Sequence, residues 1–271
     1  MNMENGICLQ SAIPVRSEPA HRAEMVTQLL FGELYLVTAS ENGWHRIRSH
    51  YDGYEGWISS LQANPVEEEE YQRLIHISTP VTLDLVQLLS SETSRSLVPL
   101  VLGSSLPGYD GSRFRIGNNH YFYEGQVSAG GDAGNDDHDR SSDPINSRLI
   151  SDAMLYLNAP YQWGGRSPFG IDCSGFTQMV CKLQGIPLLR DASQQATQGE
   201  IVPLLEEAEP GDLVFFDDAE GQIIHTGMLI DRSTIIHCSG MVRIDAIDHQ
   251  GIFSADVQQY THNLRLIRRI L

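Results

Sequence analysis

Residues 169–176 read FGIDCSGF, and they follow the run YQWGGR at residues 161–166. Apolar residues recur at helical spacing beyond Cys173, as far as the GIP run at residues 185–187, which is typical of a helix end. The pattern predicts a helix that begins at or near Cys173, with Asp172 as its N-cap.

The predicted place of Cys173 suits a reactive thiol. A helix N-terminus carries partial positive charge and unpaired N–H groups, which favour an anion. We therefore expect a lowered pKa for the Cys173 thiol and a Cys173 N–H that is available to an oxyanion. The alternative is a buried structural cysteine, which is common within an apolar helix.

A second motif reads IHTGMLI at residues 224–230 and STIIHC at residues 233–238, which predicts two strands joined by a tight turn. His225 and His237 each lie six positions from Asp231, so we expect them opposite each other on one sheet face, about 5 Å apart. One imidazole could then orient the other, as in a nucleophile–base–orienting group triad. The alternative is a pair of surface histidines in a hairpin.

The remaining histidines show no such pattern, and we expect them at the surface or in loops. They stand at positions 21, 45, 50, 76, 120, 138, 249 and 262.

The first part of the chain, residues 1–62, is predicted to form a small β-barrel. Its strand-like pieces at residues 31–39, 44–49 and 56–58 are separated by the turn signals ENG and DG. Residues 63–130 contain further strand-like pieces, at 81–85, 97–102 and 121–127, and suggest a second, more divergent barrel. The EEEE run at residues 67–70 is read as a solvated loop or a helix start.

Residues 131–143 are rich in Gly, Asp, Asn and Ser and predict a linker or mobile loop. Residues 144–271 are read as one domain. Pro144 opens a helical pattern that reaches Leu157 and stops at the NAP run of residues 158–160.

The composition is that of a globular protein, with 41% hydrophobic residues in a chain of 271. The formal net charge of −17 argues against nucleic acid or an anionic membrane as a partner. No apolar run approaches the roughly 20 residues of a membrane helix, and no secretory signal is visible at the N-terminus. We therefore expect a cytoplasmic protein, or a periplasmic or secreted one if a signal was trimmed.

Four cysteines occur without a C-x-x-C pair, and no Asp, Glu and His cluster has ligand spacing. We therefore expect no metal and no cofactor. Cys8, Cys181 and Cys238 are expected to be buried free thiols.

The order of the motifs resembles that of the NlpC-type cell-wall cysteine peptidases. The DCSG run at residues 172–175, the HTGM run at 225–228 and then His237 match the catalytic positions of that family, and GDLVFF at 211–216 matches the strand that precedes its first histidine. The order of the runs LYLV at residues 34–37, GWHRIR at 43–48 and GYEGWI at 53–58 resembles that of a bacterial SH3-like domain. The resemblance implies an α+β fold, a papain-like domain preceded by one or two SH3-like barrels.

The resemblance also implies roles. Cys173 would attack the scissile carbonyl, His225 would accept its proton and His237 would orient His225. Tyr161 would place its hydroxyl near the oxyanion, although a packing role is the alternative.

A closer resemblance is to the SH3-containing γ-D-glutamyl-L-diamino-acid endopeptidases, which act on murein stem peptides whose L-Ala amine is free. It implies that Asp191 binds the ammonium, although Asp191 could equally cap a helix. Asp172 and Ser174 would bind the first substrate residues. Tyr54 and Glu24 would close the pocket, the alternatives being a barrel-surface tyrosine and a solvated glutamate. Ala192 stands where some relatives have Ser, and Ser193 or Ser174 could substitute for that hydroxyl.

Two alternatives keep the same motifs. One is a related cysteine amidase or acyltransferase that acts on another cell-wall substrate. The other is a non-catalytic protein that binds wall peptide, against which the intact Cys and His set argues.

Overall fold

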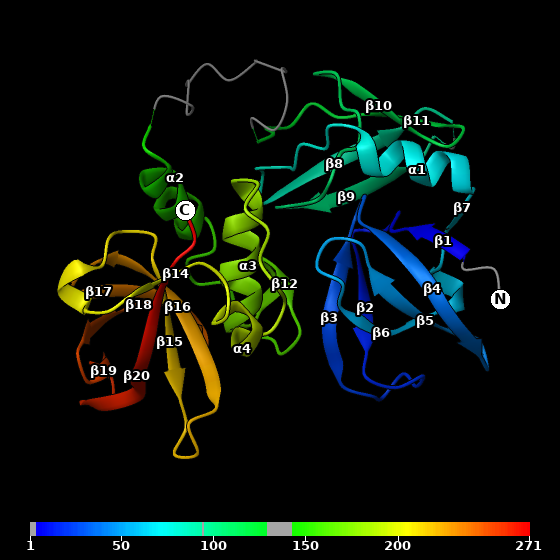
Figure 1. The fold of residues 1–271 in the computed structure, drawn as a ribbon. Helices are drawn as coiled ribbons and strands as arrows, with labels where there is room; N and C mark the ends of the chain where they lie inside the picture. The colour runs from blue at the N-terminus through cyan, green and yellow to red at the C-terminus, as the bar shows by residue number, and fades with distance from the viewer. Residues whose placement is uncertain (1–3, 94, 129–142) are drawn as a thin grey trace. The chain divides into compact units, whose positions relative to one another are not determined.

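The structure is a computed structural model that describes residues 4–93, 95–128 and 143–271. The chain divides into two compact units, residues 1–139 and residues 140–271 (Figure 1). The predicted linker, residues 131–143, lies outside the described residues except for Asp143. In the described part of the chain, no helix is both long enough and apolar enough to span a membrane.

The first unit begins with an antiparallel sheet in the order β3-β2-β6-β5-β4-β1-β7. Its strands are β1 (Glu4–Ile7), β2 (Ala12–Arg16), β3 (Met25–Leu30), β4 (Leu34–Glu41), β5 (Trp44–Ser49), β6 (Glu55–Ser59) and β7 (Pro65–Val66), with a 3-10 turn η1 (Ser60–Gln62). The strands predicted between residues 31 and 58 are confirmed as β4, β5 and β6. The predicted turn between β4 and β5 is also present, because Asn42 and Gly43 both have positive φ, as a two-residue hairpin turn requires.

The second part of this unit holds a helix and a four-stranded antiparallel sheet in the order β10-β11-β8-β9. These elements are α1 (Glu68–His76), β8 (Val86–Ser91), β9 (Leu97–Val101), β10 (Arg113–Ile116) and β11 (Asn119–Phe122). The glutamate run is a helix start, with Glu67 as N-cap and three glutamates in the first turn, where the helix dipole favours them. The assignment of a second SH3-like barrel stays a prediction.

One hydrophobic core is shared by both parts of the first unit, and a second one, around Ile13, Leu29 and Ile47, lies within the SH3-like part. Phe31 and Leu34 pack in the same buried cluster as Tyr71 of α1 and Tyr121 of β11. Gly32, with φ of 80°, makes the close contact possible, since a Cβ at this position would lie 2.0 Å from a backbone oxygen of the second part. The predicted domain boundary between residues 62 and 63 therefore separates segments that pack in the same core.

The second unit combines helices with a sheet in the order β14-β20-β15-β16-β17-β18-β19, in which β20 also pairs with β19 and closes a ring. The helical elements are α2 (Ile145–Met154), α3 (Cys173–Leu183), α4 (Ala192–Gln195) and the 3-10 turn η3 (Leu205–Glu207). The strands are β12 (Arg166–Ser167), β13 (Gly170–Ile171), β14 (Glu200–Val202), β15 (Leu213–Asp217), β16 (Ile223–Asp231), β17 (Thr234–Ser239), β18 (Met241–Asp248), β19 (Gly251–Ser254) and β20 (Gln259–Arg269). Helix α3 lies against β16 and β17.

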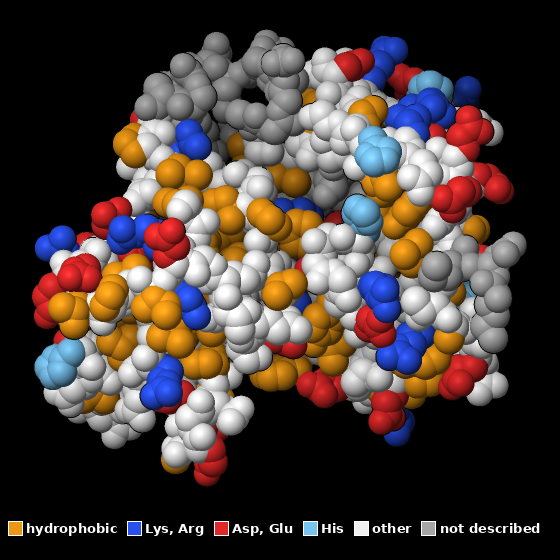
Figure 2. Space-filling model, in the orientation of Figure 1, with side chains coloured by type: hydrophobic (Ala, Val, Ile, Leu, Met, Phe, Trp, Pro, Cys, Tyr) orange, Lys and Arg blue, Asp and Glu red, His pale blue; other side chains and the backbone are white. Residues whose placement is uncertain are grey.

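The helix predicted from Pro144 is present but shorter than expected. Pro144 is its N-cap, and α2 ends at Met154, three residues before Leu157. The predicted buried free thiols are confirmed at Cys8, Cys181 and Cys238. On the face shown in Figure 2, acidic and basic side chains are interspersed over the surface.

Candidate active site

The helix α3 begins at Cys173, as the sequence predicts. The Asp172 side chain caps it, with Oδ1 accepting the Gly175 N–H at 2.6 Å. Gly185, with φ of 72°, ends it, and the Ile186 N–H returns to the Cys181 carbonyl at 2.9 Å. This arrangement is a Schellman motif. Cys173 is therefore held in the first turn of a well-terminated helix.

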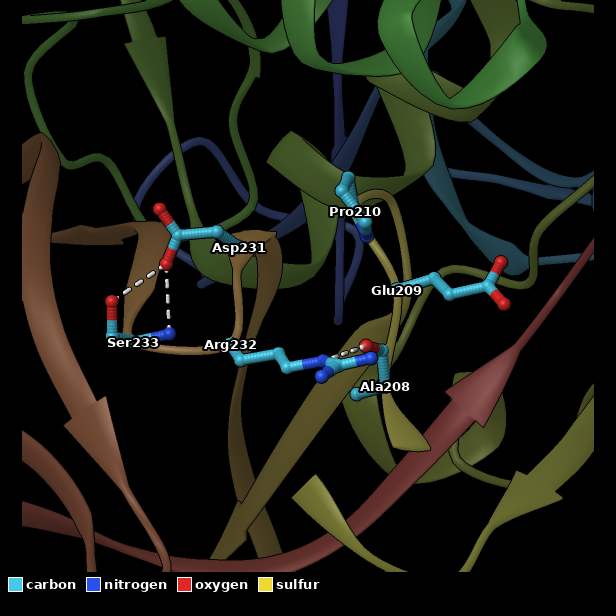
Figure 3. Close-up of a pocket in the computed structure, with 6 residues that line it drawn as sticks. All are labelled: Ala208, Glu209, Pro210, Asp231, Arg232 and Ser233. Atoms are coloured by element: carbon cyan, nitrogen blue, oxygen red, sulfur yellow. Dashed lines mark hydrogen bonds between the residues drawn. The ribbon is translucent and has the colours of Figure 1, made fainter. Parts of the chain in front are cut away.

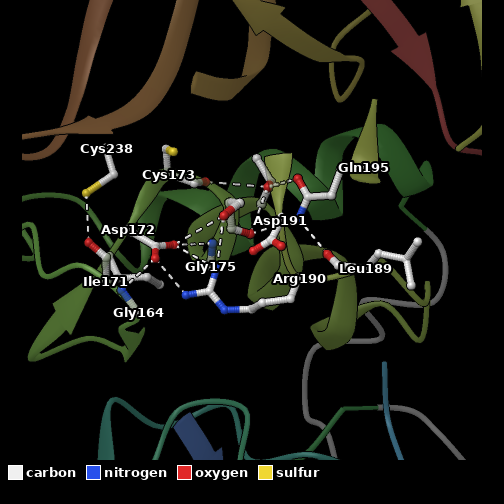
Figure 4. A network of polar contacts seen from close by, with 12 residues as sticks. Gly164, Ile171, Asp172, Cys173, Gly175, Leu189, Arg190, Asp191, Gln195 and Cys238 are labelled. Carbon is white, nitrogen blue, oxygen red and sulfur yellow. Dashed lines mark hydrogen bonds and ion pairs between the residues drawn. The ribbon is translucent and has the colours of Figure 1, made fainter. Parts of the chain in front are cut away.

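A buried ion pair fixes the segment in front of Cys173 (Figure 4). Arg190, which is 1% exposed, donates to Asp172 Oδ1 at 3.0 Å and to Oδ2 at 2.6 Å. The Gly164 N–H donates to the same carboxylate at 2.8 Å, and Arg190 also donates to Ser174 Oγ at 2.9 Å. Together with the Gly175 N–H, these donors engage both Asp172 oxygens. The Asp172 carboxylate thus links the start of α3 to Gly164 and Arg190. Its contact with substrate stays a prediction.

The Cys173 thiol is 8% exposed, and burial raises its pKa to about 12. The Asp172 carboxylate raises the pKa further, whereas the Thr226 and Ser174 N–H groups and the Arg190 charge lower it. The expectation of a lowered pKa is therefore wrong. The helix N-terminus does supply donors, but desolvation and the neighbouring carboxylate outweigh them, so the resting thiol is neutral.

The side chains of His225 and His237 are in contact, as the sequence predicts. His225 Nε2 and His237 Nδ1 lie 2.8 Å apart, and both rings are buried. Their predicted register is wrong, because His237 pairs with Gly227 and not with His225. The turn is closed by the pair Asp231 and Thr234, and a bulge before Asp231 shifts the register, so the histidines are diagonal neighbours on one face.

Gly227 leaves room for this diagonal contact. A Cβ on Gly227 would lie 2.7 Å from the His237 Cβ, which is closer than side chains approach. The small residue opposite His237 therefore lets its ring lie beside that of His225.

The polar chain continues beyond His237. His237 Nε2 lies 3.0 Å from Asp245 Oδ2, and Arg243 pairs with both Asp245 oxygens, at 2.7 and 2.9 Å. Burial raises the pKa of Asp245, but the hydrogen bonds from His237 and Arg243 outweigh it and hold the pKa below its usual value. Sequence reasoning missed Asp245. The sequence feature that could have revealed it is an acidic residue at a buried position of a strand, β18, in which buried and exposed residues largely alternate.

His262 also belongs to this cluster. Its ring stacks on that of His225, with centroids 4.1 Å apart and planes 28° apart. Burial lowers the pKa of His262 to about 4, and His237 lowers it further, while Asp245 acts in the opposite direction. Burial, His237 and His262 together lower the pKa of His225 well below 6.5. The expectation of a surface or loop position for His262 is wrong, because it lies on β20 inside the ring of strands.

Tyr161 lies close to the candidate nucleophile. Burial raises its pKa to about 12, and the nearby Cys173 and Asp172 raise it further. The backbone of Tyr161 pairs with Ile171, two residues before Cys173. The predicted oxyanion role of its hydroxyl stays a prediction.

Asp191 is the N-cap of α4 and takes part in a capping box, in which Gln194 Oε1 accepts the Asp191 N–H at 3.1 Å. This is the structural alternative considered for Asp191, and binding of an ammonium there stays a prediction. Glu24 and Tyr54 belong to the first unit, next to β3 and β6. Their part in a substrate pocket stays a prediction too.

A separate hollow of about 400 Å³ lies at the turn between β16 and β17 (Figure 3). Asp231 in its wall accepts bonds from the Ser233 N–H and Oγ at 2.7 and 2.8 Å, and Arg232 donates to the Ala208 carbonyl at 3.4 Å. His225 stands six residues away along β16, roughly 20 Å at the rise of a strand. This hollow is therefore not part of the candidate active site.

Comparison with known proteins agrees with these motifs. Residues 158–261 match the NlpC/P60 family, and residues 15–62 match the bacterial dipeptidyl-peptidase Sh3 domain. The chain is 31% identical over 229 residues to the gamma-D-glutamyl-L-lysine dipeptidyl-peptidase of Bacillus subtilis (strain 168), an alignment that covers 78% of this chain and 71% of the relative. It is 24% identical over 265 residues to dipeptidyl-peptidase 6 of Lysinibacillus sphaericus, covering 91% and 93% of the two chains.

A solved structure shares the fold. The crystal structure of an NlpC/P60 family protein from Bacillus cereus ATCC 10987 has a TM-score of 0.79 at 21% identity and covers 98% of this chain and 99% of its own. The predicted α+β architecture, a papain-like domain preceded by an SH3-like region, is confirmed. This chain belongs to the NlpC/P60 family of cell-wall peptidases.

Proposed function

We propose that this protein is a cysteine peptidase that hydrolyses the γ-D-glutamyl-L-diamino-acid bond of murein stem peptides with a free N-terminal L-Ala. The observation that carries the proposal is the contact between His225 and His237 on strands that pack against the helix opened by Cys173. The names of the relatives support the choice of bond. Turnover or recycling of cell-wall peptides, in the cytoplasm, is the setting we propose.

The proton path that we propose starts from the contact between the two histidines. Because His225 uses Nε2 for His237, its Nδ1 is the nitrogen left to accept the thiol proton. Sγ of Cys173 attacks the scissile carbonyl as its proton passes to Nδ1. The imidazolium of His225 then protonates the leaving amine, and water hydrolyses the thioester with His225 again as base.

The resting groups are neutral, since the pKa of Cys173 is raised and that of His225 is lowered. Proton transfer therefore accompanies attack on the carbonyl. The Cys173 N–H, which has no intrahelical acceptor, and the Tyr161 hydroxyl are the donors we propose for the oxyanion.

Recognition of the free amine is the finer part of the proposal. A buried ammonium needs a charged partner, and Asp191 is our choice. Ser174 and Asp172 would contact the first substrate residues. A stem peptide still joined to sugar has no ammonium, so it would not supply the positive charge that Asp191 is proposed to bind and would be rejected.

Mass spectrometry of the products tests the bond and the amine together. The substrates are L-Ala-γ-D-Glu-L-Lys and its diaminopimelate counterpart, each with a free or an acetylated N-terminus. We expect cleavage after D-Glu in the free peptides and little in the acetylated ones. Equal turnover of acetylated peptides or intact peptidoglycan would remove the amine-recognition proposal, and cleavage of a muramyl amide instead would favour a related amidase.

The nucleophile needs its own pair of variants. Cys173→Ala should abolish hydrolysis, while Cys181→Ala, on the core side of the same helix, should retain it. Retained turnover in Cys173→Ala would disprove the assignment of the nucleophile.

A further inference from the structure

We propose that Asp245 is a positioning residue, which fixes the tautomers of His237 and His225 so that the lone pair of His225 Nδ1 is available to the Cys173 thiol. This inference rests on the proposed function. Asp245 would be the fourth residue in the series Cys173, His225 and His237, and Arg243 would keep its carboxylate charged.

The inference starts from the place of Asp245. The residue is 8% exposed and sits on β18, beside the strand that carries His237. Its Oδ2 lies 3.0 Å from His237 Nε2. A deprotonated carboxylate can only accept hydrogen bonds, so the proton of this contact belongs to His237 Nε2.

The remaining protons follow from that one. A neutral His237 that carries its proton on Nε2 has a lone pair on Nδ1. His225 Nε2, 2.8 Å away, must then be the donor. A neutral His225 with its proton on Nε2 presents the lone pair of Nδ1. Asp245 thereby sets the tautomer of His225, the proposed base, through the intervening ring of His237.

Arg243 makes a charged Asp245 tolerable in this buried place. Its Nε lies 2.7 Å from Asp245 Oδ2, and its Nη2 donates to Oδ1 at 2.9 Å. Arg243 also pairs with Asp256 at 2.7 Å, whose side chain is 69% exposed. A buried carboxylate with a guanidinium partner at both oxygens, hydrogen-bonded through one of them, stays ionised, as its acceptor role requires.

A merely structural role is the competing explanation, because Arg243, which pairs with Asp245 on the same strand, also pairs with Asp256 in the segment between β19 and β20. The two explanations differ in what they predict for protons. A structural tie affects unfolding, whereas a tautomer-setting residue also changes which ring nitrogens carry hydrogen in the folded protein.

The first measurement uses the unaltered protein. ¹⁵N NMR of histidine-labelled full-length chain at pH 7.5 should show both His225 and His237 neutral with the proton on Nε2. A proton on Nδ1 of either ring would overturn the inference, whatever any variant does. This experiment needs no substrate, so it can fail or succeed independently of the proposed peptidase activity.

The second measurement compares variants. Asp245→Asn keeps the shape but can donate to His237 Nε2, so we expect kcat to fall about 10²–10⁴-fold, as when the equivalent carboxylate of a Ser-His-Asp triad is neutralised. KM should change by no more than about threefold, because no substrate contact is removed. The rate of Cys173 alkylation by iodoacetamide should fall as well. Asp248→Asn, at a partly exposed residue of the same strand bonded to Tyr260, is the matched control and should behave as the unaltered protein.

Two outcomes decide the comparison. A folded Asp245→Asn protein with unchanged histidine ¹⁵N shifts and an unchanged alkylation rate would overturn the inference in favour of the structural tie. Altered tautomers with slowed alkylation, in a protein that never cleaves the murein peptides, would retain the inference and remove the proposed function.

Discussion

At the scale of single residues, the buried imidazoles link folding to pH. His225 and His262 have pKa values lowered from 6.5, to about 4 for His262, because burial disfavours their charged forms. Between pH 6.5 and 4 the unfolded chain therefore binds more protons at these positions than the folded chain. Their neutral forms support full stability above pH 6.5, and stability is lost as the pH falls through this window.

We expect His262→Phe to reduce that loss. The ring stack on His225 is kept, but one titrating group disappears, so the fall in unfolding free energy between pH 7.5 and pH 4.5 should shrink by about 1–2 kcal/mol after allowance for solvent screening. Urea unfolding at the two pH values measures it. His249→Phe, at an exposed turn position, is the control. An identical fall in all three proteins would contradict the expected role of the buried ring.

The neutral thiol of Cys173 gives a second prediction at this scale. With a pKa raised to about 12, the thiolate fraction grows about tenfold per pH unit across the accessible range. The alkylation rate of the unliganded protein by iodoacetamide should therefore keep rising through pH 9. A plateau near pH 7 would indicate a thiolate–imidazolium pair instead.

Sequence reasoning succeeded at the residue scale wherever the signal was local. The cap at Asp172 and the helix from Cys173 follow from neighbouring residues. The thiol pKa was mispredicted because burial depends on the whole packed unit, not on the helix end alone. His262 was missed because barrel closure brings it to His225 from the last strand, β20, and Asp245 was missed because its contact with His237 depends on the register between β17 and β18.

At the scale of elements, the Asp172–Arg190 ion pair joins the start of α3 to the segment before α4. Both partners are buried, and their side-chain atoms lie 2.6 Å apart. Removing one partner of such a pair leaves a buried charge uncompensated.

We expect Arg190→Met to cost about 3–5 kcal/mol of unfolding free energy and to lower activity, since the cap of α3 is disturbed. The control is Arg265→Met on β20, where the ion pair with Asp217 spans 3.6 Å and the arginine side chain is 60% exposed. That change should cost about 0–1 kcal/mol. Denaturant unfolding measures the unfolding free energy of both variants. Equal losses would show that the buried ion pair stabilises the protein no more than the exposed one.

The hairpin of β16 and β17 shows how far element-level prediction reaches. The even separation of His225 and His237 correctly assigned both to one face. Their direct pairing was mispredicted because the turn is centred on Arg232 and Ser233 and not on Asp231, while a bulge before Asp231 keeps the two rings on the same face. A shift of two residues leaves each side chain on the same face of the sheet, but it changes which residue lies opposite.

At the scale of the molecule, the first unit is held by a core that crosses the predicted boundary at residue 62. Phe31 and Leu34 of the SH3-like part are covered by Tyr71 and Leu74 of α1. The segment that matches the Sh3 domain therefore relies on the following segment to bury Phe31 and Leu34, beside the cluster around Ile13, Leu29 and Ile47 that it buries itself.

We expect a fragment of residues 1–62 to unfold at a much lower temperature than a fragment of residues 1–128, or to remain unfolded. Circular dichroism melting of the two fragments measures the difference. Equal melting temperatures would show that the SH3-like part is independent. The strand pattern could not reveal this dependence, since both parts read as β-rich segments with turns between them.

The closed ring of the second unit makes its last described strand indispensable. β20 pairs with β14, β15 and β19, and it carries His262 to the ring of His225. Until β20 has been synthesised, three strand edges stand open and the imidazole of His225 lacks its stacking partner. A nascent chain on the ribosome would thus carry Cys173 and both other histidines for some time without a finished catalytic centre, and the cell would meet a competent hydrolase only after translation of this strand is complete.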